Sequence, residues 1–208
     1  RDLVRSRGLG DVYKRQEATV MPAPEGHGYK FQRTDLEGEP IVDALAENVV
    51  NTQRGTVVAR GETSVSTIEH LMAALYASGV DNALIRVNAP EVPILDGSAR
   101  PWFDALAQAG LQEQKADKDY YVVKHKIEIA DEATGSKILI LPDDEFSVEV
   151  KVNFESPVLS NQYASMEHLE EFGKEIADAR TFVFVREIEP LVQAGYIKGG
   201  DLDNAIVI

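Results

Sequence analysis

Residues 66–81 constrain the fold most, because their apolar side chains repeat at the spacing of an α-helix. Four of them recur at i, i+3, i+4 and i+7, which predicts a helix with one buried stripe. The stripe consists of Ile68, Leu71, Met72 and Leu75. At roughly 100° per residue, Glu69 and His70 point away from that stripe. The pattern therefore predicts an amphipathic helix that carries a carboxylate and an imidazole outside the core.

The Glu69–His70 pair has two interpretations. One is chemical: a histidine binds a metal ion while the neighbouring glutamate moves protons. The other is structural: Ser66 and Glu69 form a capping box, in which the serine caps the helix and the glutamate reaches back to the serine amide. An exposed His70 then needs no role. The position of the pair in the sequence leaves both interpretations open.

Composition excludes several classes of function. The chain of 208 residues contains no cysteine, so any metal must be bound by His, Asp or Glu. The formal net charge of −14 argues against nucleic acid as a partner. No apolar run approaches the roughly 20 residues of a transmembrane helix, and no segment resembles a signal peptide. These features predict a cytoplasmic protein without a transmembrane segment.

The chain divides into two halves at a polar stretch, residues 111–118, which has the composition of a linker. Each half has strands followed by helices, which indicates an α+β fold rather than a dinucleotide-binding sheet. The first half is expected to hold strands at 28–33, 56–60 and 84–88, with helices that begin near Ser66 and Pro101 and end at Gly79 and Gly110. The second is expected to hold a three-stranded meander (121–129, 137–141, 146–154), helices at 166–177 and 187–194, and strands at 182–185 and 205–208.

The two ends differ in character from the rest. Residues 1–16 are basic whereas the remainder is acidic, and they lack a clear period of 2 or 3.6. They are interpreted as a non-native extension, with a basic arm for anionic partners as the alternative. The last four residues, 205–208, are apolar with no polar tail, which predicts that the natural chain continues. The expected domains are therefore 17–118 and 119–208, the second truncated at its C-terminus.

Several short segments resemble one enzyme family in the same order and with short gaps. The most specific are residues 67–71 (Thr-Ile-Glu-His-Leu) and 82–100, which includes Ile-Leu-Asp-Gly-Ser-Ala-Arg. The likeness continues through residues 29–36, 161–163, 179–182, 199–200 and 205–207. The chain from about Glu17 onward resembles UDP-3-O-acyl-N-acetylglucosamine deacetylase, the zinc amidase of lipid A biosynthesis. Residues 156–163 are similar to members that are fused to a hydroxyacyl-carrier dehydratase.

The resemblance implies a fold and a reaction. The fold would be α+β, with two similar α/β two-layer sandwich domains facing a cleft, the second incomplete here. The reaction would be hydrolysis of the N-acetyl group of a UDP-linked acyl-glucosamine substrate by a zinc-activated water. The alternative is a non-catalytic binding module of the same fold, in which Glu69 and His70 belong to a helix cap.

The resemblance also implies roles for four residues. His70 matches a zinc ligand and Glu69 the general base beside it. Thr181 matches a threonine whose hydroxyl stabilises the oxyanion, and Phe182 a residue that lines the sugar and acyl site. The remaining ligands of the Zn²⁺ cofactor are expected beyond Ile208, so residues 1–208 alone are predicted to be inactive.

Other interpretations follow from the residues alone. Thr181 is then a strand residue and Phe182 a core aromatic. Asp96-Gly97-Ser98 is a turn into a helix with Ser98 as its cap. The remaining histidines are interpreted as loop or surface residues rather than ligands: His27, His125 and His168. Gly199-Gly200 is a weak signal for a phosphate-binding loop, because no helix start with Lys-Ser/Thr follows it.

Overall fold

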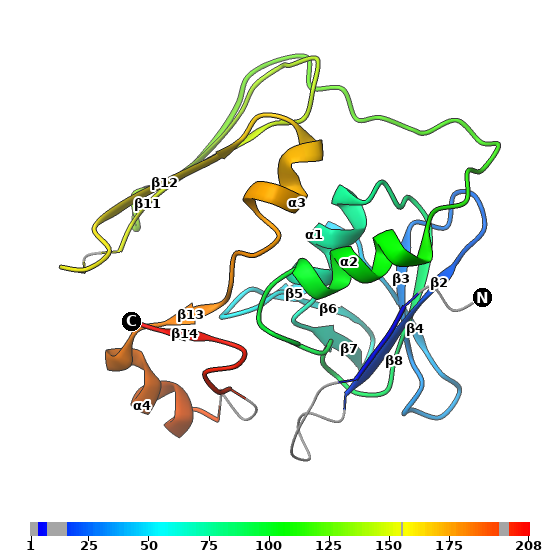
Figure 1. Cartoon of the computed structure of the whole chain (residues 1–208), viewed down its shortest axis with the longest axis horizontal. Coiled ribbons are helices and arrows are strands. Elements are labelled where there is room, and N and C mark those ends of the chain that lie inside the picture. The colour runs from blue at the N-terminus through cyan, green and yellow to red at the C-terminus, as the bar shows by residue number, and fades with distance from the viewer. Residues whose placement is uncertain (1–3, 8–15, 155, 196–199) are drawn as a thin grey trace. The chain divides into compact units, whose positions relative to one another are not determined.

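A computed structural model describes residues 4–7, 16–154, 156–195 and 200–208 of the chain (Figure 1). The chain forms two compact units. The first unit combines Arg1–Ala116 with Phe172–Ile208, and the second consists of Asp117–Glu171.

A five-stranded sheet forms the centre of the first unit (Figure 1). Its order is β1-β2-β8-β3-β4, and the neighbours are antiparallel except for the parallel pair β3–β8. The strands are β1 (Val4–Arg7), β2 (Glu17–Pro22), β3 (Tyr29–Arg33), β4 (Ile41–Asp43) and β8 (Ala83–Val87). Burial alternates along β2, β3 and β8, as expected for strands with one face against the core.

A smaller antiparallel sheet and two helices complete the first half of this unit. The sheet has the order β5-β6-β7, with strands β5 (Val49–Asn51), β6 (Val57–Arg60) and β7 (Thr63–Ser66). A 3-10 turn, Ala46–Asn48, precedes β5. Helices α1 (Glu69–Ala77) and α2 (Arg100–Ala109) pack against each other. Both helices contribute to the core, since Leu71, Leu75, Trp102 and Leu106 are at most 2% exposed.

The predicted helical stripe is confirmed, and the capping box, one of the two interpretations of the Glu69–His70 pair, is wrong. Ile68, Leu71 and Leu75 are buried, and Met72 is half-buried. Ser66, however, is the last residue of β7, and its hydroxyl donates to the carbonyl of Pro90 at 3.2 Å. The Ser66 hydroxyl is committed to a neighbouring segment of the chain and does not cap α1, whose N-cap is Ile68. The pairing of β7, which is a tertiary feature, therefore overrides the local cap signal.

The C-terminal end of α1 matches the expected glycine stop. Gly79 has φ +73°, a conformation that favours glycine. Its amide donates to the Tyr76 carbonyl, and the Val80 amide donates to the Leu75 carbonyl, each at 3.0 Å. This pair of bonds satisfies carbonyls at the helix end and turns the chain toward β8.

Residues 172–208 form the last part of the first unit. They contain α3 (Phe172–Glu175), β13 (Phe182–Val183), α4 (Val185–Gln193) and β14 (Ile206–Val207). β13 and β14 are parallel, with Phe182 opposite Ile206, and α4 lies between them in the sequence. Gly199 of the predicted phosphate-binding signal lies outside the described residues.

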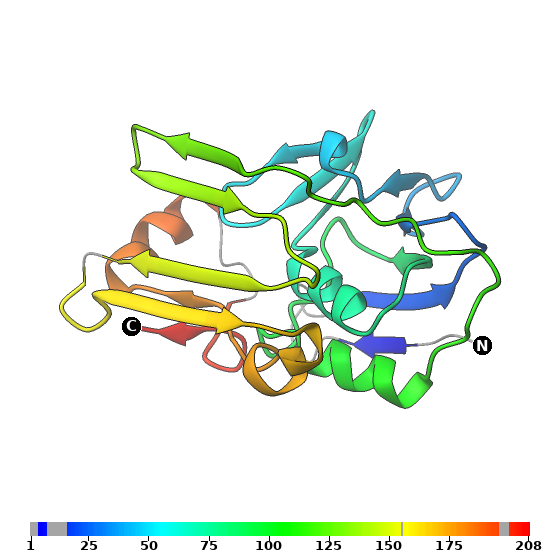
Figure 2. The ribbon, with the colours of Figure 1, turned by 90° about the horizontal axis from the view of Figure 1, so that it is seen from above.

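The second unit consists of two antiparallel hairpins (Figure 2). One pairs β9 (Ile127–Asp131) with β10 (Ser136–Ile140), and the other pairs β11 (Val148–Asn153) with β12 (Asn161–Met166). The predicted three-stranded meander is wrong, because β11 pairs with the later strand β12 in a register that places Val148 opposite Met166. A 3-10 turn follows at Leu169–Glu171.

The predicted helix at 166–177 is also wrong in extent. Met166 ends β12, and the helical residues are the turn 169–171 and α3, which has four residues. Met166 is 6% exposed and faces Val148 across the hairpin. Cross-strand pairing thus decides the conformation of a residue whose neighbours are compatible with a helix.

The mixed α+β class is confirmed, whereas the domain boundaries 1–16, 17–118 and 119–208 stay predictions. The first unit already includes β1, which lies within residues 1–16 and pairs with β2 so that Val4 is opposite Val20. The polar stretch 111–118 is partly anchored: the Glu25 carboxylate accepts the amides of Lys115 and Ala116 at 2.7 and 3.0 Å. Within the described part of the chain, no helix is long and apolar enough to cross a membrane.

Candidate active site

Glu69 and His70 occupy the first turn of α1, where their surroundings differ. Glu69 is exposed, and its carboxylate accepts a hydrogen bond from the backbone amide of Thr56, the residue directly before β6. His70 is half-buried, and burial lowers the pKa of its imidazole, although the charges of Glu69 and Asp96 act in the opposite direction. Burial therefore favours the neutral imidazole, which is the form that binds metal ions.

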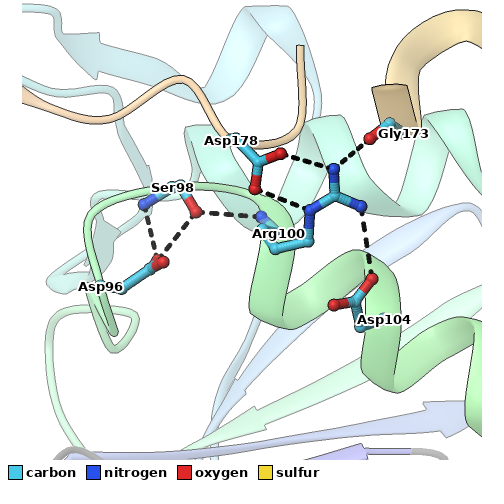
Figure 3. Close-up of polar contacts among 6 residues, drawn as sticks. All are labelled: Asp96, Ser98, Arg100, Asp104, Gly173 and Asp178. Carbon is cyan, nitrogen blue, oxygen red and sulfur yellow. Dashed lines mark hydrogen bonds and ion pairs between the residues drawn. The ribbon is translucent and has the colours of Figure 1, made fainter. Parts of the chain in front are cut away.

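Asp96, whose charge acts on His70, is held by a turn that leads into α2 (Figure 3). Its Oδ1 accepts hydrogen bonds from the Ser98 amide at 3.0 Å and the Ser98 hydroxyl at 2.8 Å. The Ser98 hydroxyl oxygen accepts the amide of Arg100 at 3.1 Å. The predicted turn is confirmed, and Ser98 satisfies the first amide of α2, although Ala99 is the N-cap residue.

Gly97 lies in close contact with the C-terminal segment. Its φ is +81°, and a Cβ at this position would lie 2.0 Å from the carbonyl oxygen of Asn204. Both the conformation and the space require glycine. Asn204 itself is 5% exposed. The turn at 96–98 is therefore packed against backbone that is more than 100 residues later in the chain.

Thr181 contacts the same turn, and Phe182 follows it in the chain. The Thr181 amide donates to the Gly97 carbonyl at 2.8 Å, and its carbonyl accepts the Ile206 amide at 2.8 Å. Arg180 donates from Nε to the Asp96 carbonyl at 2.7 Å. Thr181 is exposed and Phe182 is 38% exposed, with its ring edge-to-face with Phe184 at 5.7 Å. Phe182 is therefore not a buried core aromatic.

The turn Asp96–Ser98 thus connects the two groups of predicted site residues. The charge of its carboxylate opposes the effect of burial on the pKa of His70, and its carbonyls accept hydrogen bonds from Arg180 and Thr181. The sequence predicts a structural role for this turn and none for Arg180, although Arg180 lies in the segment 179–182 that carries the family resemblance.

The described residues alone do not fit a complete zinc site. Among them there is no group of three or more His, Asp or Glu side chains that could hold a metal ion. His125 and His168 are exposed, and His168 pairs through Nδ1 with Glu145 at 2.5 Å, which raises the pKa of its imidazole. His27 lies in the turn before β3. The interpretation of these three as loop or surface residues is confirmed.

Comparisons with known proteins give one consistent family. Residues 4–208 match the family described as LpxC: UDP-3-O-acyl N-acetylglycosamine deacetylase. The match begins at residue 4, inside the segment 1–16, and the interpretation of that segment as a non-native extension stays a prediction.

Curated relatives carry names of the same kind. A bifunctional enzyme LpxC/FabZ from Porphyromonas gingivalis is 60% identical over 190 residues, which cover 91% of this chain and 41% of the relative. A UDP-3-O-acyl-N-acetylglucosamine deacetylase from Geobacter sp. is 42% identical, over 91% of this chain and 62% of the relative. One from Methylococcus capsulatus is 39% identical, over 100% of this chain and 69% of the relative. The chain thus spans between two fifths and about two thirds of these relatives.

Proposed function

The chain belongs to the family of UDP-3-O-acyl N-acetylglycosamine deacetylases, and we propose that it carries one part of an active site that hydrolyses the N-acetyl group of UDP-3-O-acyl-N-acetylglucosamine. The observation that supports this most is the turn Asp96–Ser98, where the charge of Asp96 acts on the His70 imidazole and the Gly97 carbonyl accepts the amide of Thr181. These are the residues to which the family resemblance assigns chemistry.

In this proposal Glu69 acts on the water that attacks the amide, and Thr181 acts on the amide carbonyl. The Glu69 carboxylate accepts a proton from the attacking water, and its exposed position leaves it accessible to solvent. The Thr181 hydroxyl donates a hydrogen bond to the oxygen that becomes negatively charged when the carbonyl is attacked. The C–N bond then breaks as the leaving nitrogen takes up that proton, giving acetate and a free amine on the sugar. Phe182 would provide an exposed apolar surface beside Thr181 for the sugar or acyl group.

His70 is proposed as one ligand of a catalytic zinc ion. Such an ion would supply an activated water, and it requires about three protein ligands. The described residues do not contain a three-donor group, so they do not supply the complete ligand set, and we propose that the remaining ligands lie outside them. We therefore propose that residues 1–208 alone bind zinc weakly and release no acetate.

Two preparations test the proposal. The first is residues 1–208 dialysed against micromolar zinc. The second is a chimera in which this chain replaces the matching part of the Porphyromonas gingivalis relative. We expect zinc binding and acetate release from the UDP-linked acyl sugar only for the chimera. Stoichiometric zinc and turnover in residues 1–208 would contradict the proposed ligand set. A folded, zinc-loaded chimera that releases no acetate would favour the alternative of a binding module.

A further inference from the structure

The segment just before β13 makes three successive contacts with the turn that begins α2. Asp178 pairs with Arg100, Arg180 donates to the Asp96 carbonyl, and the Thr181 amide donates to the Gly97 carbonyl. Asp178 and Thr181, which make the first and the last of these contacts, are three residues apart in the chain. The position of Thr181 is therefore tied to the start of α2 by both side-chain and backbone contacts.

Arg100 makes the most extensive of these contacts (Figure 3). Its Nε and one Nη donate to the two carboxylate oxygens of Asp178, each at 2.8 Å. The same Nη also donates to the carbonyl of Gly173, and the other Nη donates to Asp104 at 3.4 Å. A two-point guanidinium–carboxylate pair constrains orientation as well as distance. Arg100 thus binds the segment 173–178 at both of its ends.

The backbone amide of Arg100 extends this network to the Asp96 carboxylate. This amide donates to the Ser98 hydroxyl, which in turn donates to the Asp96 carboxylate (Figure 3). The pairing with Asp178 raises the pKa of Arg100, and the pairing with Arg100 lowers the pKa of Asp178. Both partners consequently stay charged around neutral pH, so the contact persists across the pH range in which the reaction would be assayed.

We infer that the Arg100–Asp178 pair positions the Thr181 hydroxyl for the proposed reaction. Thr181 is exposed, and the buried residues Ala177 and Phe184 on either side of it fix the path of the chain but do not orient its side chain. Directional polar contacts therefore set the location of the Thr181 hydroxyl. Arg100 and Asp178 are positioning residues, because they act through the segment that ends in Thr181 and touch no reacting atom.

The first test is kinetic, and it rests on the proposed function. In the chimera, Asp178→Asn and Arg100→Lys should each lower kcat roughly tenfold, because small misplacements of a catalytic group are costly, while KM changes less than twofold. Asp104→Asn is the matched control and should leave kcat unchanged, since Arg100 keeps its pair with Asp178. The exchanged pair, Arg100→Asp with Asp178→Arg, should recover part of the lost kcat. Unchanged kcat in Asp178→Asn, or an effect on KM alone, would overturn the inference.

The second test needs no activity and uses residues 1–208. Hydrogen exchange of the Thr181 amide should become about tenfold faster in Asp178→Asn, because its bond to Gly97 opens locally. Amides between β2 and β8 should exchange at the wild-type rate. An unchanged Thr181 amide, or equally faster exchange in β2 and β8, would overturn the inference. If the unsubstituted chimera proves inactive, the proposed function fails, and the exchange result still decides whether the pair holds Thr181.

Discussion

The two sides of the candidate site are held in place by different interactions. On the α1 side, Leu71 and Leu75 are 0% exposed, so Glu69 and His70 stand on a helix whose inner face is fully buried. On the β13 side, Thr181 and Phe182 are exposed, and polar contacts to the turn 96–98 hold the strand. One side is anchored by the core and the other by directional bonds.

The difference implies unequal stability across the site. A fully buried leucine contributes roughly 1.5–3 kcal/mol, whereas a typical hydrogen bond contributes about 0.5–1.5 kcal/mol net. The β13 side should therefore open locally more often than α1. A threonine on such a segment can adjust to a substrate, while the helix that carries Glu69 and His70 stays in place.

The largest effect is expected from the core below α1. Leu71→Ala should lower the free energy of unfolding of the first unit by about 2–5 kcal/mol, because it leaves a cavity among fully buried side chains. Urea denaturation of residues 1–208 measures this. Tyr76→Ala on the same helix, where the side chain is 45% exposed, is the control and should cost less than half as much. Equal losses would mean that α1 is not anchored by its buried stripe.

The next effect concerns catalysis on the α1 side. In the chimera, Glu69→Gln should lower turnover by about a hundredfold or more, as expected for the loss of a general base, with zinc content unchanged. The melting temperature should barely change, because a glutamine oxygen can still accept the Thr56 amide. Acetate release, metal analysis and thermal unfolding test the three statements. Near-normal turnover would show that Glu69 is not the base.

A smaller catalytic effect is expected on the β13 side. Thr181→Val should lower kcat about tenfold and raise KM less, because an oxyanion donor acts mainly in the transition state. Valine keeps the shape and the strand preference, and Thr181→Ser keeps the hydroxyl and serves as the control. Steady-state kinetics of both variants in the chimera give the answer. A change in KM alone would assign Thr181 to binding or to structure.

The smallest effect is expected for the ion pair between Arg54, in the loop before β6, and Glu187 on α4. Arg54 Nη lies 2.8 Å from Glu187 Oε1, and this contact lowers the pKa of Glu187. A lowered pKa means that the pair stabilises the fold above the ordinary value of 4.5, and that this contribution is lost as pH falls through the folded-state pKa.

Arg54 is exposed and Glu187 is half-buried, so solvent still screens the pair, and its contribution should stay below about 1 kcal/mol and decrease with salt. Glu187→Gln should remove that part of the pH dependence of urea unfolding, whereas Glu189→Gln on the same helix should not. A loss well above this limit would mean that a single surface pair anchors the β13 side.

Sequence patterns predicted the α1 side of the site more accurately than the β13 side. The stripe Ile68–Leu75, the stop at Gly79 and the strand at 84–88 were all readable, because each depends on neighbours within a few residues. The Ser66–Glu69 capping box was also a local signal, and it was wrong, since pairing of β7 placed Ser66 against Pro90. The family resemblance named Thr181, but no local pattern indicated what holds it.

The sequence by itself determined the two helices of the first half and three of its strands, at 28–33, 56–60 and 84–88, but not β1, β2, β4, β5 and β7. The predicted elements follow from short-range hydrophobic periodicity, and the succession of short motifs indicated the family. The tertiary structure alone decided that β11 pairs with β12, that residues 172–208 pack with the first unit, and that Arg100 binds Asp178. The last contact joins residues 78 positions apart. The physical reason is that such pairings depend on which polar groups and strand edges meet after the core has formed.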